Sequence, residues 1–166
     1  RGPWSLRFPP NWGAPAEVTL DKLISWTDHP DPGIRYFSGT AEYQIDLEIP
    51  NELFGDGKAL SLDLGDVKCI AEVRLNGHDL GIWWKPPFAM DISSIAVSGK
   101  NTLRVRVTNL WVNRLIGDEQ LPEDVHKRGR SPGPGPQQMI AATPAVVSKP
   151  FSLMTAHRLL LLVHKT

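Results

Sequence analysis

Hydrophobic and polar residues alternate strictly along the stretch 40–49, with apolar or aromatic residues at the odd positions and polar or charged ones at the even positions. Because successive side chains of a strand point to opposite faces, this period of two predicts a half-buried antiparallel strand. The stretches 60–64 and 103–107 alternate in the same way, and turn-forming residues separate the runs. The side chains predicted to face the core are Ala41, Tyr43, Ile45, Leu47, Ile49, Leu60, Leu62, Leu64, Leu103, Val105 and Val107.

The dipeptide Asn76-Gly77 lies between two apolar-rich runs and predicts a two-residue type I′ hairpin turn. Regular pairing outward from this turn places Ala71 opposite Ile82 on the buried face. The same pairing predicts that Trp84 also faces the core. Its neighbour Trp83 then points to the opposite face, where it is free for another role.

Helical patterns are weak. The stretches 21–26 and 91–95 each begin with an Asp that is able to cap a single turn, whereas 109–119 has no clean period. The stretch 129–136 is rich in Gly and Pro and predicts a loop, and five consecutive apolar residues within 157–164 predict a last strand. Short strands at near-regular spacing therefore predict one all-β domain over residues 1–166. Its fold is an antiparallel jelly-roll sandwich of about eight strands with an irregular C-terminal segment.

Composition and charge exclude several classes of protein. The length of 166 residues suits one domain, and the 41% hydrophobic content supplies its core. Eighteen basic and eighteen acidic residues cancel, which argues against nucleic acid as a partner, and no apolar run approaches a membrane span. The lone Cys69 offers neither a disulfide nor a zinc-ligand spacing. The opening at Arg1, without Met, leads us to expect a fragment of a longer protein.

The middle of the chain resembles the sugar-binding jelly-roll domain of glycoside hydrolase family 2. This resemblance covers about half of the chain and implies a galactose-binding-like fold. The residues that carry it are 38–43 (SGTAEY), 62–65 (LDLG), 71–77 (AEVRLNG), 80–81 (LG), 87–88 (PF), 91–92 (DI) and 99–107 (GKNTLRVRV).

A narrower resemblance, to the C-terminal sandwich of family 106 α-L-rhamnosidases, extends over residues 1–124. It implies that the catalytic acids lie on a separate barrel domain and that the parent enzyme is exported, to an extracellular or periplasmic location. Residues 125–166 depart from the family pattern, although the leucines at 159–162 resemble its final strand. The motifs that carry it are 2–8 (GPWSLRF), 23–27 (LISWT), 33–39 (GIRYFSG) and 108–120 (TNLWVNRLIGDEQ).

Glycoside hydrolysis usually requires two carboxyl groups placed across the scissile bond. Asp118 and Glu119 are the obvious pair, with Glu123 and Asp124 behind them. Sequence neighbours tend to diverge, and no flanking pocket is recognisable in the sequence. We therefore predict no catalytic residue in this chain.

Carbohydrate binding has a stronger candidate in the stretch 109–120, which combines an aromatic face with amide, guanidinium and carboxylate groups. The candidate residues are Trp111, Asn113, Arg114, Asp118 and Glu119. The alternative is structural: Trp111 packs under the sandwich, Arg114 pairs with a carboxylate, and the segment docks against the catalytic domain.

Trp83 is a second candidate platform for a sugar, with Lys85 and His78 beside it. The alternative is that the Trp83 ring packs against the opposite sheet, a loop or another domain and binds no sugar. Asp28-His29-Pro30-Asp31 superficially resembles a metal loop, but calcium requires six to eight oxygen ligands and an exposed turn fits better. Similar sandwiches often hold structural calcium, yet this sequence indicates no metal and no cofactor.

The sequence therefore predicts a non-catalytic accessory domain of an α-L-rhamnosidase-like glycoside hydrolase. Its predicted partners are the catalytic domain of the parent enzyme and carbohydrate, with no nucleic acid and no membrane. The alternative is an autonomous carbohydrate-binding module, and a small complete hydrolase is a third interpretation.

Overall fold

The computed structural model describes residues 2–55, 57–67, 69–119 and 160–165. Within these ranges, nine strands form two antiparallel sheets, which confirms the predicted all-β sandwich. The six-stranded sheet has the order β2 (Glu17–Leu20), β1 (Trp4–Arg7), β3 (Thr40–Ile49), β8 (Gly99–Thr108), β5 (Ile70–Leu75) and β6 (His78–Trp83). The three-stranded sheet has the order β7 (Ala89–Asp91), β4 (Lys58–Asp63) and β9 (Leu160–Lys165).

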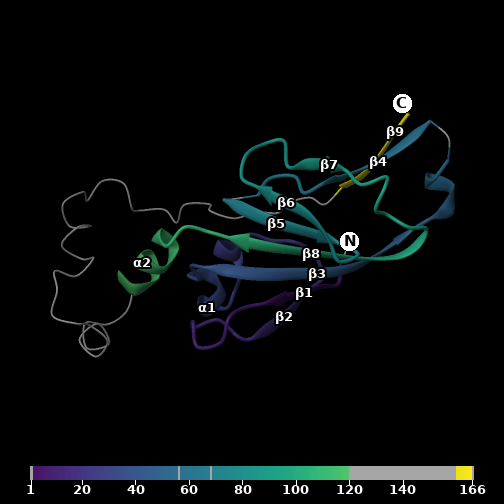
Figure 1. The fold of residues 1–166 in the computed structure, drawn as a ribbon. Coiled ribbons are helices and arrows are strands. Elements are labelled where there is room, and N and C mark those ends of the chain that lie inside the picture. Colours follow the sequence, from purple (N-terminus) through teal and green to yellow (C-terminus); the bar gives the residue numbers. More distant parts are fainter. Residues whose placement is uncertain (1, 56, 68, 120–159, 166) are drawn as a thin grey trace.

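Helices are short. Among the described residues, two are α-helices, α1 (Pro32–Arg35) and α2 (Val112–Glu119), and two are 3-10 turns, η1 (Trp26–Asp28) and η2 (Asn51–Leu53). Figure 1 shows α1 and α2 at one end of the six-stranded sheet, with β4, β7 and β9 at the other end of the molecule. The capped turn expected at 91–95 is present, since Ser93 N donates to Asp91 Oδ1, whereas the turn expected at 21–26 begins only at Trp26.

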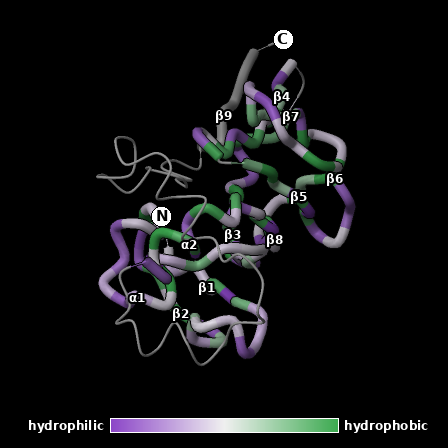
Figure 2. The backbone as a smooth tube through the Cα atoms, turned by 90° about the vertical axis from the view of Figure 1, so that its left-hand side faces the viewer, coloured by the Kyte–Doolittle hydropathy of each residue, from purple (hydrophilic) through white to green (hydrophobic). Residues whose placement is uncertain are grey.

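The core is built from the alternating residues. The side chains that alternation in 40–49, 60–64 and 103–107 predicts to face inward are all buried except Leu47, which is partly buried and packs against the core. The tube in Figure 2 accordingly changes between green and purple or white over short distances along the strands. Beneath β1 and β3 lies an aromatic cluster in which Trp26 Nε1 donates to Tyr43 Oη at 2.5 Å. Burial raises the pKa of Tyr43 well above its ordinary value, so the core holds a neutral phenol.

Two asparagine side chains join the hairpin to β8. Asn76 Nδ2 donates to Asn101 Oδ1 at 2.8 Å, and Thr102 N donates to Asn76 Oδ1 at 2.9 Å. Asn101, fully buried, also donates to the carbonyls of Val97 and Gly99. The Asn-Gly and Gly-Lys-Asn motifs are therefore structural in this fold, because their side chains hold two turns together.

The hairpin corrects one prediction. Asn76 and Gly77 both have positive φ and Leu75 pairs with His78, as expected, but a bulge then shifts the register between Glu72 and Arg74. Ala71 consequently pairs with Trp83 instead of Ile82. Trp83 is therefore buried at 8% exposure and Trp84 is 66% exposed, the reverse of the prediction. The extra residue lies at Gly81, whose φ of +87° suits a bulge.

The C-terminal part of the chain holds one confirmed prediction and one helix that was not predicted. The last strand is present as β9, paired with β4, whereas the loop predicted at 129–136 lies outside the described residues. The stretch 109–119 contains the helix α2, which the sequence did not predict. Its buried face consists of Asn113, Ile116 and Gly117, spaced as a helix requires. Only Ile116 of these three is hydrophobic, so the sequence shows no run of hydrophobic residues at helical spacing.

Candidate functional site

Two connections meet at the end of the sandwich where α1 and α2 lie. The segment from α1 to β3 is held against the segment from β8 to α2 by two asparagines. Asn109 accepts from Gly39 N and donates to Phe37 O, both at 2.8 Å. Asn113 donates to the carbonyls of Arg35 at 2.7 Å and Phe37 at 3.0 Å. Asn113 is only 2% exposed, so the structure places this predicted sugar ligand inside as an anchor of the helix.

Close packing fixes the position of α2. A Cβ on Gly117 would lie 2.5 Å from Tyr36 Cβ, so only glycine allows the helix to approach α1 this closely. The N-terminal turn of α2 is also tied down, because Arg114 N donates to Ser38 Oγ at 2.8 Å and Ser38 Oγ donates to Leu110 O at 3.1 Å. Leu110 and the first turn of α2 are therefore fixed in position relative to Ser38.

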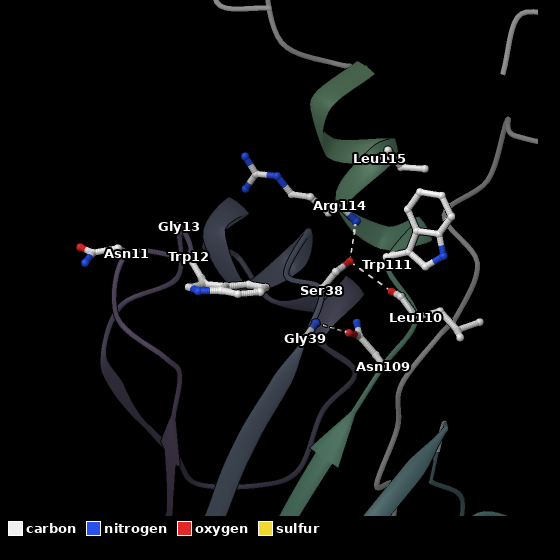
Figure 3. Close-up of a pocket in the computed structure, with 10 residues that line it drawn as sticks. All are labelled: Asn11, Trp12, Gly13, Ser38, Gly39, Asn109, Leu110, Trp111, Arg114 and Leu115. Carbon is white, nitrogen blue, oxygen red and sulfur yellow. Dashed lines mark hydrogen bonds between the residues drawn. The ribbon is translucent and has the colours of Figure 1, made fainter. Parts of the chain in front are cut away.

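An open hollow of about 780 Å³ lies at this end, and we call it the end hollow. Trp12 and Trp111 stand on opposite sides of Ser38, with Arg114 above, as Figure 3 shows. These tryptophans are 58% and 65% exposed. The lining residues are Asn11, Trp12, Gly13, Ser38, Gly39, Asn109, Leu110, Trp111, Arg114 and Leu115.

Trp12 was missed by sequence reasoning. It lies between Asn11 and Gly13, both with positive φ, in a loop that packs tightly on α1. A Cβ on Gly33 would lie 2.1 Å from Gly13 O, which shows how closely the two backbones approach. The sequence feature that could have identified Trp12 as exposed is its place within the turn-forming stretch 9–13 (PPNWG), where no core contact is expected for a large aromatic residue.

The remaining residues predicted from α2 have different surroundings. Trp111 is exposed, so the interpretation that it packs under the sandwich is wrong. Arg114 Nε lies 2.8 Å from Asp118 Oδ1, which matches the predicted structural ion pair. Glu119 is exposed and does not line the end hollow. Adjacent helical residues point about 100° apart, so the Asp118 and Glu119 carboxylates diverge.

Trp83 does not form a platform. Its ring is buried and its Nε1 donates to Leu80 O at 3.0 Å. The exposed aromatic at this edge is Trp84, with Lys85 Nζ 5.2 Å from its ring centroid, whereas His78 lies at the hairpin turn. We call the exposed surface of Ile82, Trp84 and Lys85 the edge patch. It borders a shallow depression between β6 and β7, lined also by Trp83, Pro87, Ala89 and Met90.

The loop that resembled a metal site is a helix cap. Asp31 Oδ1 accepts from Gly33 N at 2.7 Å, and His29 Nδ1 accepts from Asp31 N at 3.1 Å. No group of three or more metal-binding side chains occurs among the described residues. Among the same residues, none of the helices has the length and apolar character needed to cross a membrane.

Comparison with known proteins identifies homologues among glycoside hydrolases, although no family model matches the chain. A protein of Formosa agariphila, named as a candidate β-glucuronidase, is 45% identical over 128 residues. The match covers 77% of this chain but 11% of that protein. A rhamnosidase from Novosphingobium sp. PP1Y is 44% identical with a TM-score of 0.65, and the match covers 70% of this chain and 11% of that structure.

A β-glucuronidase of Ruminococcus gnavus shares the fold, with a TM-score of 0.52 at 23% identity. That match covers 65% of this chain and 20% of the enzyme. The chain thus spans about a tenth of the length of the two more similar relatives. It corresponds to one β-sandwich portion of much larger glycoside hydrolases.

Proposed function

We propose that this chain is a non-catalytic accessory domain of an α-L-rhamnosidase-like glycoside hydrolase. It buttresses the catalytic domain and contacts carbohydrate through the end hollow. The observation that carries the proposal is the identity of 44–45% to proteins of which the chain spans only 11%. The described residues form a β-sandwich, and the resemblance to family 106 implies that the catalytic acids of such enzymes lie on a separate barrel domain, so we assign this portion a supporting role.

The end hollow supports the carbohydrate contact. Sugars present apolar C–H faces to aromatic rings and hydroxyl groups to polar side chains. Trp12 and Trp111 provide two exposed rings, and Arg114 provides guanidinium N–H donors beside them. Leaving a large apolar side chain in water forgoes about 1.5–3 kcal/mol of burial, and a bound sugar ring recovers part of it.

An autonomous carbohydrate-binding module is the second candidate function. The specific observation in its favour is that Trp12 and Trp111, 58% and 65% exposed, border a hollow of about 780 Å³ together with Arg114. A module requires measurable affinity in the isolated chain, whereas a purely buttressing domain requires only an interface with the catalytic domain.

Two measurements on the pure chain test the proposal. Incubation with aryl α-L-rhamnoside and aryl β-D-glucuronide is expected to release no aryl alcohol. Calorimetric titration with rhamnose-terminated oligosaccharides is expected to show binding that Trp12→Ala and Trp111→Ala each weaken about tenfold. The matched control is Trp84→Ala, which removes an equally exposed tryptophan at the edge patch and is expected to leave affinity unchanged.

Hydrolysis of either aryl glycoside by the pure chain would overturn the non-catalytic role. Equal loss of binding in Trp12→Ala and Trp84→Ala would overturn the assignment of carbohydrate to the end hollow. The buttressing role is tested separately in the parent enzyme, where deletion of this domain is expected to lower the melting temperature of the catalytic domain.

A further inference from the structure

A second hollow adjoins the end hollow. It has a volume of about 490 Å³ and lies over the outer face of β1, β3 and β8; we call it the sheet hollow. The two hollows share Trp12 and Gly39. Its lining residues are Arg7, Phe8, Pro9, Trp12, Gly39, Thr40, Glu42 and Arg106.

The Trp12 side chain separates the two hollows and lines both of them. Figure 3 shows its ring edge-on, with Arg114 to one side of the ring plane and β1 and β3 running away on the other. The ring lies directly beside Gly39, since a Cβ there would contact the indole at 3.4 Å, and the φ of +139° at this position strains any residue other than glycine. A ligand in either hollow therefore reaches the same indole.

The floor of the sheet hollow is a row of charges of alternating sign. Strand register places Arg7 opposite Glu42, and Glu42 opposite Arg106. The row continues outward on both sides, where Arg7 pairs with Glu17 at 3.3 Å and Arg106 with Glu72 at 2.6 Å. Glu42 lies at the centre, and within the described residues its side chain forms neither a hydrogen bond nor an ion pair.

This floor favours a neutral polyhydroxylated ligand. Each sugar hydroxyl both donates and accepts a hydrogen bond, so neighbouring hydroxyls match a carboxylate flanked by guanidinium groups. An anionic ligand would meet the Glu42 carboxylate, and both flanking arginines already have carboxylate partners.

We infer that the ligand is a neutral oligosaccharide that spans Trp12, with successive sugar residues in the end hollow and in the sheet hollow. This inference rests on the proposed carbohydrate contact and adds the ligand's length, its charge and a second subsite centred on Glu42. The two volumes support it, because each hollow falls within the range of about 300–1,000 Å³ typical of a complete ligand site.

The test is a calorimetric titration of the chain with L-rhamnose and with rhamnose-terminated neutral oligosaccharides of two, three and four residues. Affinity is expected to rise about tenfold or more from the monosaccharide to the trisaccharide, as the second subsite fills. Glu42→Ala is expected to remove that gain, so that the trisaccharide binds only about as tightly as the monosaccharide. Glu42→Gln, which keeps the size of the side chain, is expected to lose part of it.

Gln44→Ala is the matched control, because Gln44 lies two residues further along the same face of β3 and outside the sheet hollow. Equal affinity for all ligand lengths, or equal effects of Glu42→Ala and Gln44→Ala, would overturn the two-subsite inference. Provided Trp12→Ala still weakens binding, the proposed function survives that result. An absence of binding to every length would overturn both.

Discussion

The end hollow and the edge patch both expose tryptophan, but their surroundings differ. At the end hollow, Trp12 and Trp111 border a concave space with Arg114 and a charged sheet surface nearby. At the edge patch, Trp84 lies beside Ile82 on the outermost strand, over a shallow depression, and its cationic neighbour Lys85 already covers its ring.

This difference indicates that exposure alone does not identify a sugar site. Carbohydrate requires ring faces together with donors and acceptors at a distance that hydroxyls can span. The end hollow supplies both, whereas the edge patch supplies mainly apolar surface. The predictions below perturb one region while leaving the other unchanged.

The largest effect is expected at the boundary between core and edge patch. Trp83→Ala should lower the free energy of unfolding by about 3–5 kcal/mol, because it empties a buried aromatic site. Trp84→Ala should change it by less than about 1 kcal/mol, since only an exposed ring and its contact with Lys85 are lost. Urea unfolding followed by circular dichroism measures both values. If Trp84→Ala lost more stability than Trp83→Ala, Trp84 would be the buried residue, the hairpin would have the regular register, and the bulge would be wrong.

Gly117→Ala should lower the free energy of unfolding by about 1–3 kcal/mol, because the new methyl group collides with Tyr36 and pushes α2 away from α1. The same shift moves Trp111 and Arg114, so oligosaccharide affinity should fall as well. The control Val112→Ala, on the exposed side of α2, should change neither value appreciably. In a free helix, alanine stabilises by roughly 1 kcal/mol over glycine, and a gain of that sign here would show that α2 does not pack as described.

Gly81→Ala should be milder, costing about 1–2 kcal/mol of stability. No atom lies within 4 Å of the position of the added Cβ, so the cost arises from its φ of +87° alone. Oligosaccharide affinity should stay unchanged, because the bulge lies at the edge patch. Thermal denaturation measures the stability and calorimetric titration measures the affinity. Unaltered stability would contradict the positive φ at Gly81, because it would show that a residue with a Cβ adopts this backbone conformation without strain.

Much of the sandwich could be predicted because period-two alternation is a local signal. The faces of β3, β4 and β8 followed directly from it, and the Asn-Gly dipeptide, also a local signal, predicted the turn at Asn76-Gly77. The bulge at Gly81 could not be predicted in this way, because one extra residue reverses every later side chain without changing the apolar pattern. The prediction from the sequence therefore placed Trp84 in the core and Trp83 outside, the reverse of the structure.

The candidate site was predicted only in part. Trp111 and Arg114 were identified, but Asn113 and Gly117 are the buried face of α2, and no hydrophobic period reveals a polar or side-chain-free face. Trp12 and Glu42 reach the site through contacts between segments far apart in the chain. Their roles depend on the tight approach of the 9–13 loop to α1 and on strand register, neither of which the sequence shows.

The most direct test of the account is a two-dimensional NMR titration of the six tryptophan indole N–H signals with a rhamnose-terminated trisaccharide. The signals of Trp12 and Trp111 should shift with a common saturation curve, while that of Trp84 stays in place. Buried Trp4, Trp26 and Trp83 should report only small changes. A saturable shift of the Trp84 signal, with Trp12 and Trp111 unmoved, would contradict the account and assign carbohydrate to the edge patch.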